Sequence, residues 1–153
     1  MASRIPAVRM KSRFCCFVAG GAANDVASYS IGANGAPTML HSLNLGNNNQ
    51  AITTARSGQL AVVSGGAFAS ISIIKVASDG TLTQVAGSPF TTAAATSGYA
   101  LVNPSGSFLY ATEANRIEAF KMDAAGALTS INTYPLITPG VTTAGFATGM
   151  VIY

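Results

Sequence analysis

A stretch of about 45 residues recurs along the chain, and this recurrence limits the possible folds more than any other feature. A shift of 45 residues places Phe17–Gly21 on Val62–Gly66, and the same shift places Asn34-Gly35 on Asp79-Gly80 without a gap. A chain that repeats at this period builds its fold from copies of one supersecondary unit, each packed against the next.

A third copy follows at a shift of 46 residues. It places Ile117–Lys121 on Ile71–Lys75, and Ala125-Gly126 falls on the turn pair of the second copy. Nearer the start of this copy the shift becomes 48, because Ser57-Gly58 aligns with Ser105-Gly106. Since the two-residue difference is confined to a loop, it is compatible with a true structural repeat.

Each copy contains four short runs rich in Val, Ile, Tyr, Phe and Thr, which is the composition of β-strands. In the third copy we expect strands at Tyr99–Asn103, Phe108–Thr112, Ile117–Met122 and Leu128–Asn132. Ser-Gly, Asp-Gly and Asn-Gly pairs between the runs supply the positive φ that tight hairpin turns require. Four antiparallel strands in about 45 residues are the content of one β-propeller blade. The sequence therefore predicts an all-β fold, a partial β-propeller of about three four-stranded antiparallel blades plus a remnant strand or two.

We expect a single partial propeller domain over residues 1–153, with blades at about 5–49, 50–97 and 98–139 and a remnant at 140–153. Propellers close with about four to eight blades. Three blades leave an open fan with exposed apolar faces and unpaired strand edges. Three explanations stay open: truncation of a longer propeller, self-association of copies to complete a ring, or a different all-β closure.

Charge is scarce, because 8 Lys and Arg with 5 Asp and Glu make up 8% of the chain, against about 25% in an average protein. With 49% apolar residues, this composition excludes intrinsic disorder. Half of the cations lie in the first 13 residues, so the other 140 carry four cations and five acids. A nucleic-acid-binding face needs clustered Lys and Arg. Nucleic acid is therefore not an expected partner.

The basic start of the chain ends at Arg13, and the apolar run Phe14–Ala19 follows it, as in a short secretory signal. The repeat favours another interpretation, because it places Ala7–Arg13 opposite Ile52–Gly58, as an innermost strand. The run is shorter than the roughly 20 residues of a transmembrane helix, so no membrane span is expected. Low charge and the abundance of Ser, Thr, Gly and Ala favour a secreted or cell-envelope protein.

The chain offers few ligands for a metal. Adjacent Cys15 and Cys16 do not meet disulfide geometry within a strand. There is one histidine, His41, and no Cys-x-x-Cys spacing. We therefore predict no metal site and no cofactor. We expect His41 on the outer strand Met39–Leu45 of the first blade, as a structural residue away from the central channel.

One group of motifs resembles a known family. The segment Phe108–Thr112 after Asn103–Gly106, with Gly87–Phe90 in the preceding copy, resembles the YVTN-type repeats of the propeller lactonases. This is the 6-phosphogluconolactonase-like or carboxymuconate-cyclase-like superfamily. The resemblance implies a blade of a seven-bladed propeller and hydrolysis of a sugar lactone such as 6-phosphogluconolactone. Its motifs are strand and turn residues, so it implies the fold more specifically than the activity.

Candidate catalytic residues are scarce on the face where the loops should gather. In a propeller, the turns between second and third strands and the linkers between blades meet around the channel. Glu113 and Arg116 flank one such turn and could form a general acid or base with an anion-holding partner. The alternative is an exposed loop salt bridge that contributes little energy.

Asparagines are the candidate ligand-binding residues on the same face. Asn47, Asn48 and Asn49 form the densest polar cluster, in a linker between blades, and Asn24 and Asn115 belong to two turns. Their amides could hydrogen-bond a sugar lactone or another glycan, although ordinary polar loops have the same composition. Two functions therefore remain: a lactone hydrolase, which we do not expect to be catalytically competent as an isolated three-blade chain, or a non-catalytic propeller module that binds protein or glycan through its loops.

Overall fold

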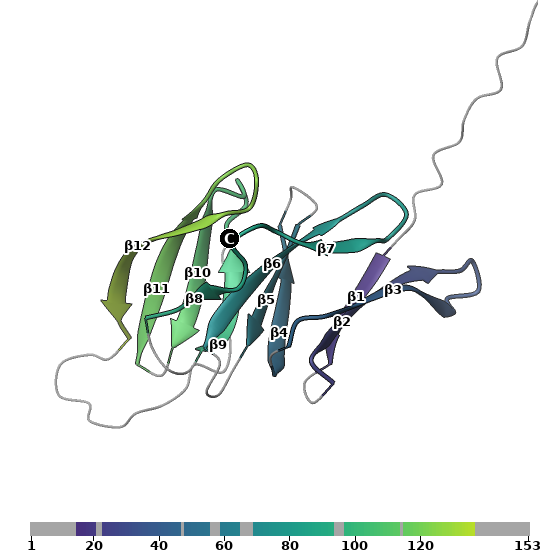
Figure 1. The fold of residues 1–153 in the computed structure, drawn as a ribbon, viewed down its shortest axis with the longest axis horizontal. Coiled ribbons are helices and arrows are strands. Elements are labelled where there is room, and N and C mark those ends of the chain that lie inside the picture. Colours follow the sequence, from purple (N-terminus) through teal and green to yellow (C-terminus); the bar gives the residue numbers. More distant parts are fainter. Residues whose placement is uncertain are drawn as a thin grey trace, which may run out of the picture.

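The computed structural model describes residues 15–20, 23–46, 48–55, 59–64, 69–93, 97–113 and 115–136. These residues form three antiparallel sheets that stand side by side as an open fan (Figure 1). No helix occurs among them. The all-β prediction is therefore confirmed.

The three sheets follow one another along the chain. The first has the order β1 (Cys15–Gly20), β2 (Asp25–Ile31), β3 (Pro37–Asn44). The second has the order β4 (Asn49–Thr54), β5 (Gln59–Ser64), β6 (Ser70–Val76), β7 (Leu82–Gln84), and the short β8 (Phe90–Thr91) also pairs with β6. The third contains β9 (Ser97–Val102), β10 (Phe108–Glu113), β11 (Arg116–Met122) and β12 (Leu128–Pro135), each paired with the next.

The four strands predicted in the third copy all form, and the last extends three residues beyond its expected end. Two predicted segments lie outside the described residues: the innermost strand of the first blade, at 7–13, and the remnant at 140–153.

The repeat is reproduced at the level of single hydrogen bonds. In each sheet a hairpin is closed by a backbone N–H that donates to the carbonyl four residues on: Gly32 to Ala36 at 2.9 Å, Ala77 to Thr81 at 2.9 Å, and Asp123 to Ala127 at 3.1 Å. The donors are 45 and 46 residues apart, the spacings found in the sequence. Each hairpin contains a glycine at positive φ: Gly35 at 79°, Gly80 at 93° and Gly126 at 92°.

Side chains complete these turns in two ways. Asn34 and Asp79 each accept a hydrogen bond from the backbone N–H two residues on, as turn asparagines and aspartates commonly do. Ala125 occupies the same place in the third copy and has no acceptor to offer. There Asp123 accepts the N–H of Ala127 at 2.9 Å instead. The turn is thus kept although the residue that usually supports it is absent.

Two apolar clusters hold the fan together, one at each junction between neighbouring sheets. The cluster between the first and second sheets contains Val26, Leu45, Ile74 and Leu82. The cluster between the second and third contains Ala55, Ile71, Ile73, Val85, Ala100, Leu109, Ala111, Phe120 and Met122. Because side chains alternate along a strand, β6 supplies Ile71 and Ile73 to one cluster and Ile74 to the other.

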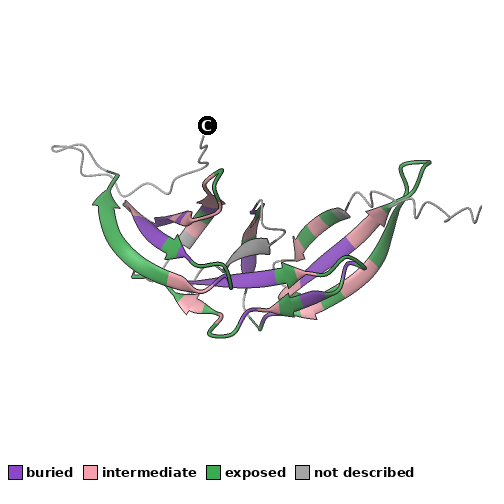
Figure 2. Ribbon diagram, turned by 90° about the horizontal axis from the view of Figure 1, so that it is seen from above, coloured by how far each residue is buried: buried purple, intermediate pink, exposed green. Residues whose placement is uncertain are grey.

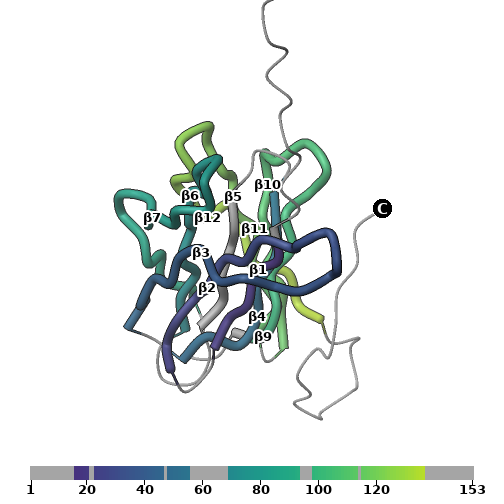
Figure 3. The backbone as a smooth tube through the Cα atoms, turned by 90° about the vertical axis from the view of Figure 1, so that its right-hand side faces the viewer, coloured from purple at the N-terminus to yellow at the C-terminus, as the bar shows by residue number. Residues whose placement is uncertain are grey.

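The middle sheet is accordingly packed on both faces, whereas each end sheet is packed on one. Figure 2 shows buried residues gathered in the middle of the fan and mostly exposed residues towards its two edges. Figure 3 gives the side view, with the first sheet in front of the other two.

Candidate functional site

The predicted face of turns and linkers is present in all three sheets. Where an outer strand ends, the next backbone N–H donates to the carbonyl of the turn between the second and third strands of the blade. The three bonds are Leu45 to Asn24 at 2.9 Å, Thr92 to Ala69 at 3.2 Å, and Leu136 to Asn115 at 2.9 Å. The acceptors are again 45 and 46 residues apart. We call this end of the sheets the loop face.

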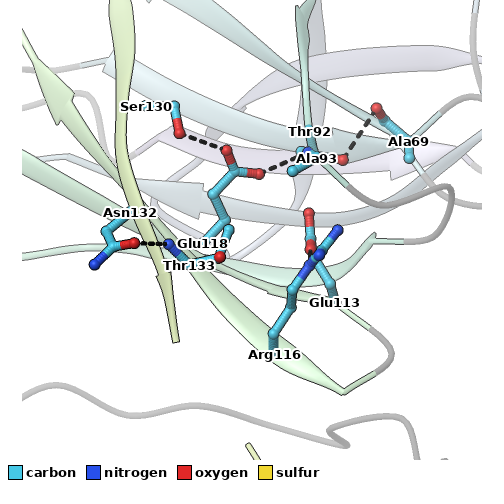
Figure 4. A network of polar contacts seen from close by, with 9 residues as sticks. All are labelled: Ala69, Thr92, Ala93, Glu113, Arg116, Glu118, Ser130, Asn132 and Thr133. Carbon is cyan, nitrogen blue, oxygen red and sulfur yellow. Dashed lines mark hydrogen bonds and ion pairs between the residues drawn. The ribbon is translucent and has the colours of Figure 1, made fainter. Parts of the chain in front are cut away.

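Glu113 and Arg116 form an ion pair on the loop face. Glu113 ends β10 and Arg116 begins β11, and Arg116 Nε donates to Glu113 Oε2. The side chain of Glu113 is fully buried, whereas that of Arg116 is 32% exposed (Figure 4). The pair is thus the salt bridge that the alternative interpretation expected, but it is not an exposed one, because its acidic member is inside the protein.

Burial changes what this pair can do chemically. Charges attract more strongly where water is excluded, and the guanidinium presents its N–H donors in a rigid planar fork. Glu113 therefore holds the orientation of a cationic side chain that is itself 32% exposed. Such a group can bind a phosphate, a carboxylate or a developing oxyanion.

Two of the predicted ligand-binding asparagines turn out to be the same position of the repeat. Asn24 and Asn115 are 91 residues apart, the sum of the two shifts, and both accept a linker N–H through their backbone carbonyls. Asn24 adopts a positive φ of 59°, which asparagine tolerates better than most residues. Both residues thus support the loop face, and Asn115 is exposed there.

The other asparagines differ from one another. Asn49 is the first residue of β4 and is buried, and its amide donates to the carbonyl of Asp25 at 3.3 Å. Asn48 is exposed in the linker before it. Asn47 lies outside the described residues. The cluster is therefore not a single polar surface, because one of its members joins two sheets.

Glu118 is a residue of the loop face that the sequence analysis missed. It lies in β11 and is buried, and its carboxylate accepts hydrogen bonds from Ala93 N at 2.7 Å and Ser130 Oγ at 2.6 Å. Figure 4 shows it between the linker that follows β8 and the outer strand β12. One signal was available in the sequence. Glu118 lies two and four residues before Phe120 and Met122, so it shares the face of the strand that points into the core. An acid at an inward position of a strand indicates a buried polar contact.

His41 is found on the outer strand of the first sheet, as predicted. Its Nδ1 accepts a hydrogen bond from Leu82 N at 3.4 Å, and the ring is partly buried. The imidazole therefore bridges the first and second sheets, in keeping with the structural role expected for it.

Two further findings concern the described residues only. They contain no group of three or more His, Cys, Asp and Glu residues placed to hold a metal ion. None of their elements is a helix long and apolar enough to cross a membrane.

No protein-family model and no curated protein matches the sequence. Solved structures do match. A protein from Lactobacillus plantarum superposes with a TM-score of 0.71 at 19% identity, over 82% of this chain and 40% of the other. The periplasmic gluconolactonase of Pseudomonas aeruginosa superposes with a TM-score of 0.68 at 16% identity, over 76% of this chain and 35% of the other.

A protein from Bacteroides fragilis, provisionally assigned as a 6-phosphogluconolactonase, matches with a TM-score of 0.65 at 20% identity. The chain has the β-propeller fold of these structures. At these identities the likeness concerns the fold alone. The chain spans 35–40% of the length of these three structures, and its three sheets correspond to part of each.

Proposed function

We propose that this chain is a lactone-hydrolysing propeller unit that receives a sugar lactone, of the 6-phosphogluconolactone type, at Glu113 and Arg116 on its loop face. The observation that carries the proposal is the buried Glu113 carboxylate paired with Arg116, whose side chain is partly exposed. Support comes from the lactonase-type fold, since two of the matching structures are described as lactonases of gluconic acid derivatives.

The proposed chemistry needs one cation and one base. Water attacks the lactone carbonyl carbon and gives a proton to the base, and the carbonyl oxygen becomes an oxyanion. The carbonyl then re-forms as the ring C–O bond breaks, and the ring oxygen takes up that proton from the base. Arg116 is suited to stabilise the oxyanion or to hold an anionic substituent of the sugar. Glu113 orients the guanidinium and is the candidate acceptor for the proton of the attacking water.

The second candidate function is a non-catalytic module that binds glycan or protein at the loop face. Exposed Asn48 and Asn115 favour it, because amides hydrogen-bond sugar hydroxyls without any chemistry. In that case Arg116 contributes to binding only.

We predict that Arg116→Ala and Glu113→Gln each lower lactone hydrolysis by the folded 153-residue chain at least about tenfold, because a single oxyanion donor or base typically contributes more than this. Lys121→Ala is the matched control. Lys121 is an exposed cation on the same strand, β11, at the end away from the loop face, so its removal should leave hydrolysis unchanged. The readout is proton release on adding gluconolactone or its 6-phosphate.

The outcomes separate the two functions. Hydrolysis that falls in both loop-face variants supports the enzyme. Absence of hydrolysis, with calorimetric lactone or glycan binding that is lost in Arg116→Ala, overturns the enzyme and supports the binding module. If the folded chain neither hydrolyses nor binds these compounds, both proposals fail.

A further inference from the structure

The large apolar side chains that the described residues expose are all on the two end sheets. The first sheet exposes Val18, Ile31 and Met39. The third exposes Tyr99, Ile131 and Tyr134, with Leu136 directly after β12. Among the side chains of the middle sheet whose burial is described, which leave out those of β5, no large apolar one is exposed. Such patches mark surfaces that are meant to be covered.

Strand pairing shows which face of the first sheet carries this patch. Val26 and Ser28 of β2 point to the second sheet, because Val26 belongs to the shared core and Ser28 Oγ donates to Gly80 O at 2.6 Å. Val18 lies opposite Ala27 and Met39 lies opposite Tyr29, so both point the other way. We call this surface the rear face.

The third sheet carries its patch on the opposite side of the fan. Phe120 and Met122 of β11 point to the second sheet. Tyr134 lies opposite Ile117, at the other parity of the same strand, and therefore points away from the second sheet. Tyr99 precedes the core residue Ala100 and also points away. We call this surface the front face.

One position of the repeat shows what a front face normally contacts. Leu40, Val85 and Ile131 are 45 and 46 residues apart. Leu40 packs on Gly80 of the following sheet, and Val85 is buried in the core shared with the following sheet. Ile131 is 52% exposed. It is the extra residue of a β-bulge, as Leu40 is, since the pairing of β11 with β12 and of β2 with β3 each skips one residue there.

The partner position shows the same contrast at the other end of the fan. Gly80 is buried by Leu40, whose Cδ1 would lie 2.5 Å from a Cβ added at Gly80. Its equivalent in the first sheet, Gly35, has no atom within 4 Å of such a Cβ and is exposed. The hairpin at Gly35 is therefore a receiving surface that none of the described sheets covers.

We propose that the front face of one copy of this chain docks on the rear face of a second copy, with Ile131 over the Gly35 hairpin as Leu40 lies over the Gly80 hairpin. The contact continues the interface between sheets that the chain already forms twice. Because the two faces differ, the association is head-to-tail and closes when the rotation allows. Two copies supply six sheets, within the range of four to eight blades that propellers use, whereas three copies would supply nine.

We predict that the 153-residue chain forms a dimer in light scattering, with twice the 15.4 kDa mass of one chain. Ile131→Asp on the front face and Met39→Asp on the rear face should each raise the dissociation constant at least about tenfold, because each places a charge in an apolar contact. Thr83→Asp is the control, since it places the same charge at an exposed position of the middle sheet. Circular dichroism checks that all three variants remain folded.

Mixing the two end-face variants tests the head-to-tail geometry. The Met39→Asp copy keeps an intact front face and the Ile131→Asp copy keeps an intact rear face, so together they should form a one-to-one complex that neither forms alone. A monomeric parent chain, a dimer that both variants leave intact, or a mixture that fails to associate would each overturn the proposal. These measurements use no lactone, so their outcome is independent of the proposed function.

Discussion

Replacing Glu118 with alanine is expected to lower the free energy of unfolding by about 3 kcal/mol, since hydrogen bonds to a charged group contribute about 1.5–3 kcal/mol each and some desolvation cost is recovered. The buried carboxylate accepts two such bonds, one from Ala93 N and one from Ser130 Oγ. Ala93 belongs to the linker between the second and third sheets, so the loss also loosens the attachment of the third sheet. Urea unfolding followed by circular dichroism gives the free energy.

Two milder variants locate this effect. Ser130→Ala removes one bond and leaves the bond from Ala93, so it should cost about 1.5 kcal/mol, the lower end of that range. Glu118→Gln keeps the shape of the side chain and one acceptor, so it should fall between Ser130→Ala and Glu118→Ala. A double-mutant cycle of Glu118→Ala with Ser130→Ala gives the interaction energy between these two side chains. A change below about 0.5 kcal/mol in Glu118→Ala would show that the carboxylate does not hold the linker.

The strands and hairpins were predictable because their causes are local. Branched and aromatic runs favour strands, and the pairs at Gly35 and Gly80 reach the positive φ of a tight turn. Because the sequence repeats, a strand or turn predicted in one copy was also predicted at the aligned positions of the other two copies. Even Ala125, which offers no side-chain acceptor, could be placed in its turn by alignment with Asp79.

The loop face was only partly predictable, because its contacts join residues that are distant in the sequence. Glu118 meets Ala93 from 25 residues away, and no local pattern indicates that partner. The burial of Glu113 depends in the same way on packing around the end of β10. The equivalence of Asn24 and Asn115, in contrast, could be predicted from the sequence, because the two residues are separated by the sum of the two repeat shifts. A comparison of candidate site residues across the copies would have revealed it.

Replacing Gly80 with alanine is expected to cost about 3 kcal/mol, about 2 kcal/mol more than the same change at Gly35. Both glycines have positive φ, so both substitutions incur the strain of a Cβ in that conformation. Both also lower the entropy of the unfolded chain equally, so that contribution cancels in the comparison. The difference that remains is steric, because a Cβ at Gly80 would lie 2.5 Å from Leu40 Cδ1 and 3.0 Å from Leu40 Cβ.

This comparison belongs in the Ile131→Asp background, where the proposed docking on the Gly35 hairpin is removed and each free energy of unfolding describes one copy. There, equal costs at Gly35 and Gly80 would contradict close packing of Leu40 on the second sheet. Combining Gly80→Ala with Leu40→Ala should recover part of the loss, because the smaller side chain leaves room for the added Cβ. In the parent chain, Gly35→Ala should additionally weaken the dimer, since its Cβ would meet Ile131 of the second copy as one at Gly80 meets Leu40.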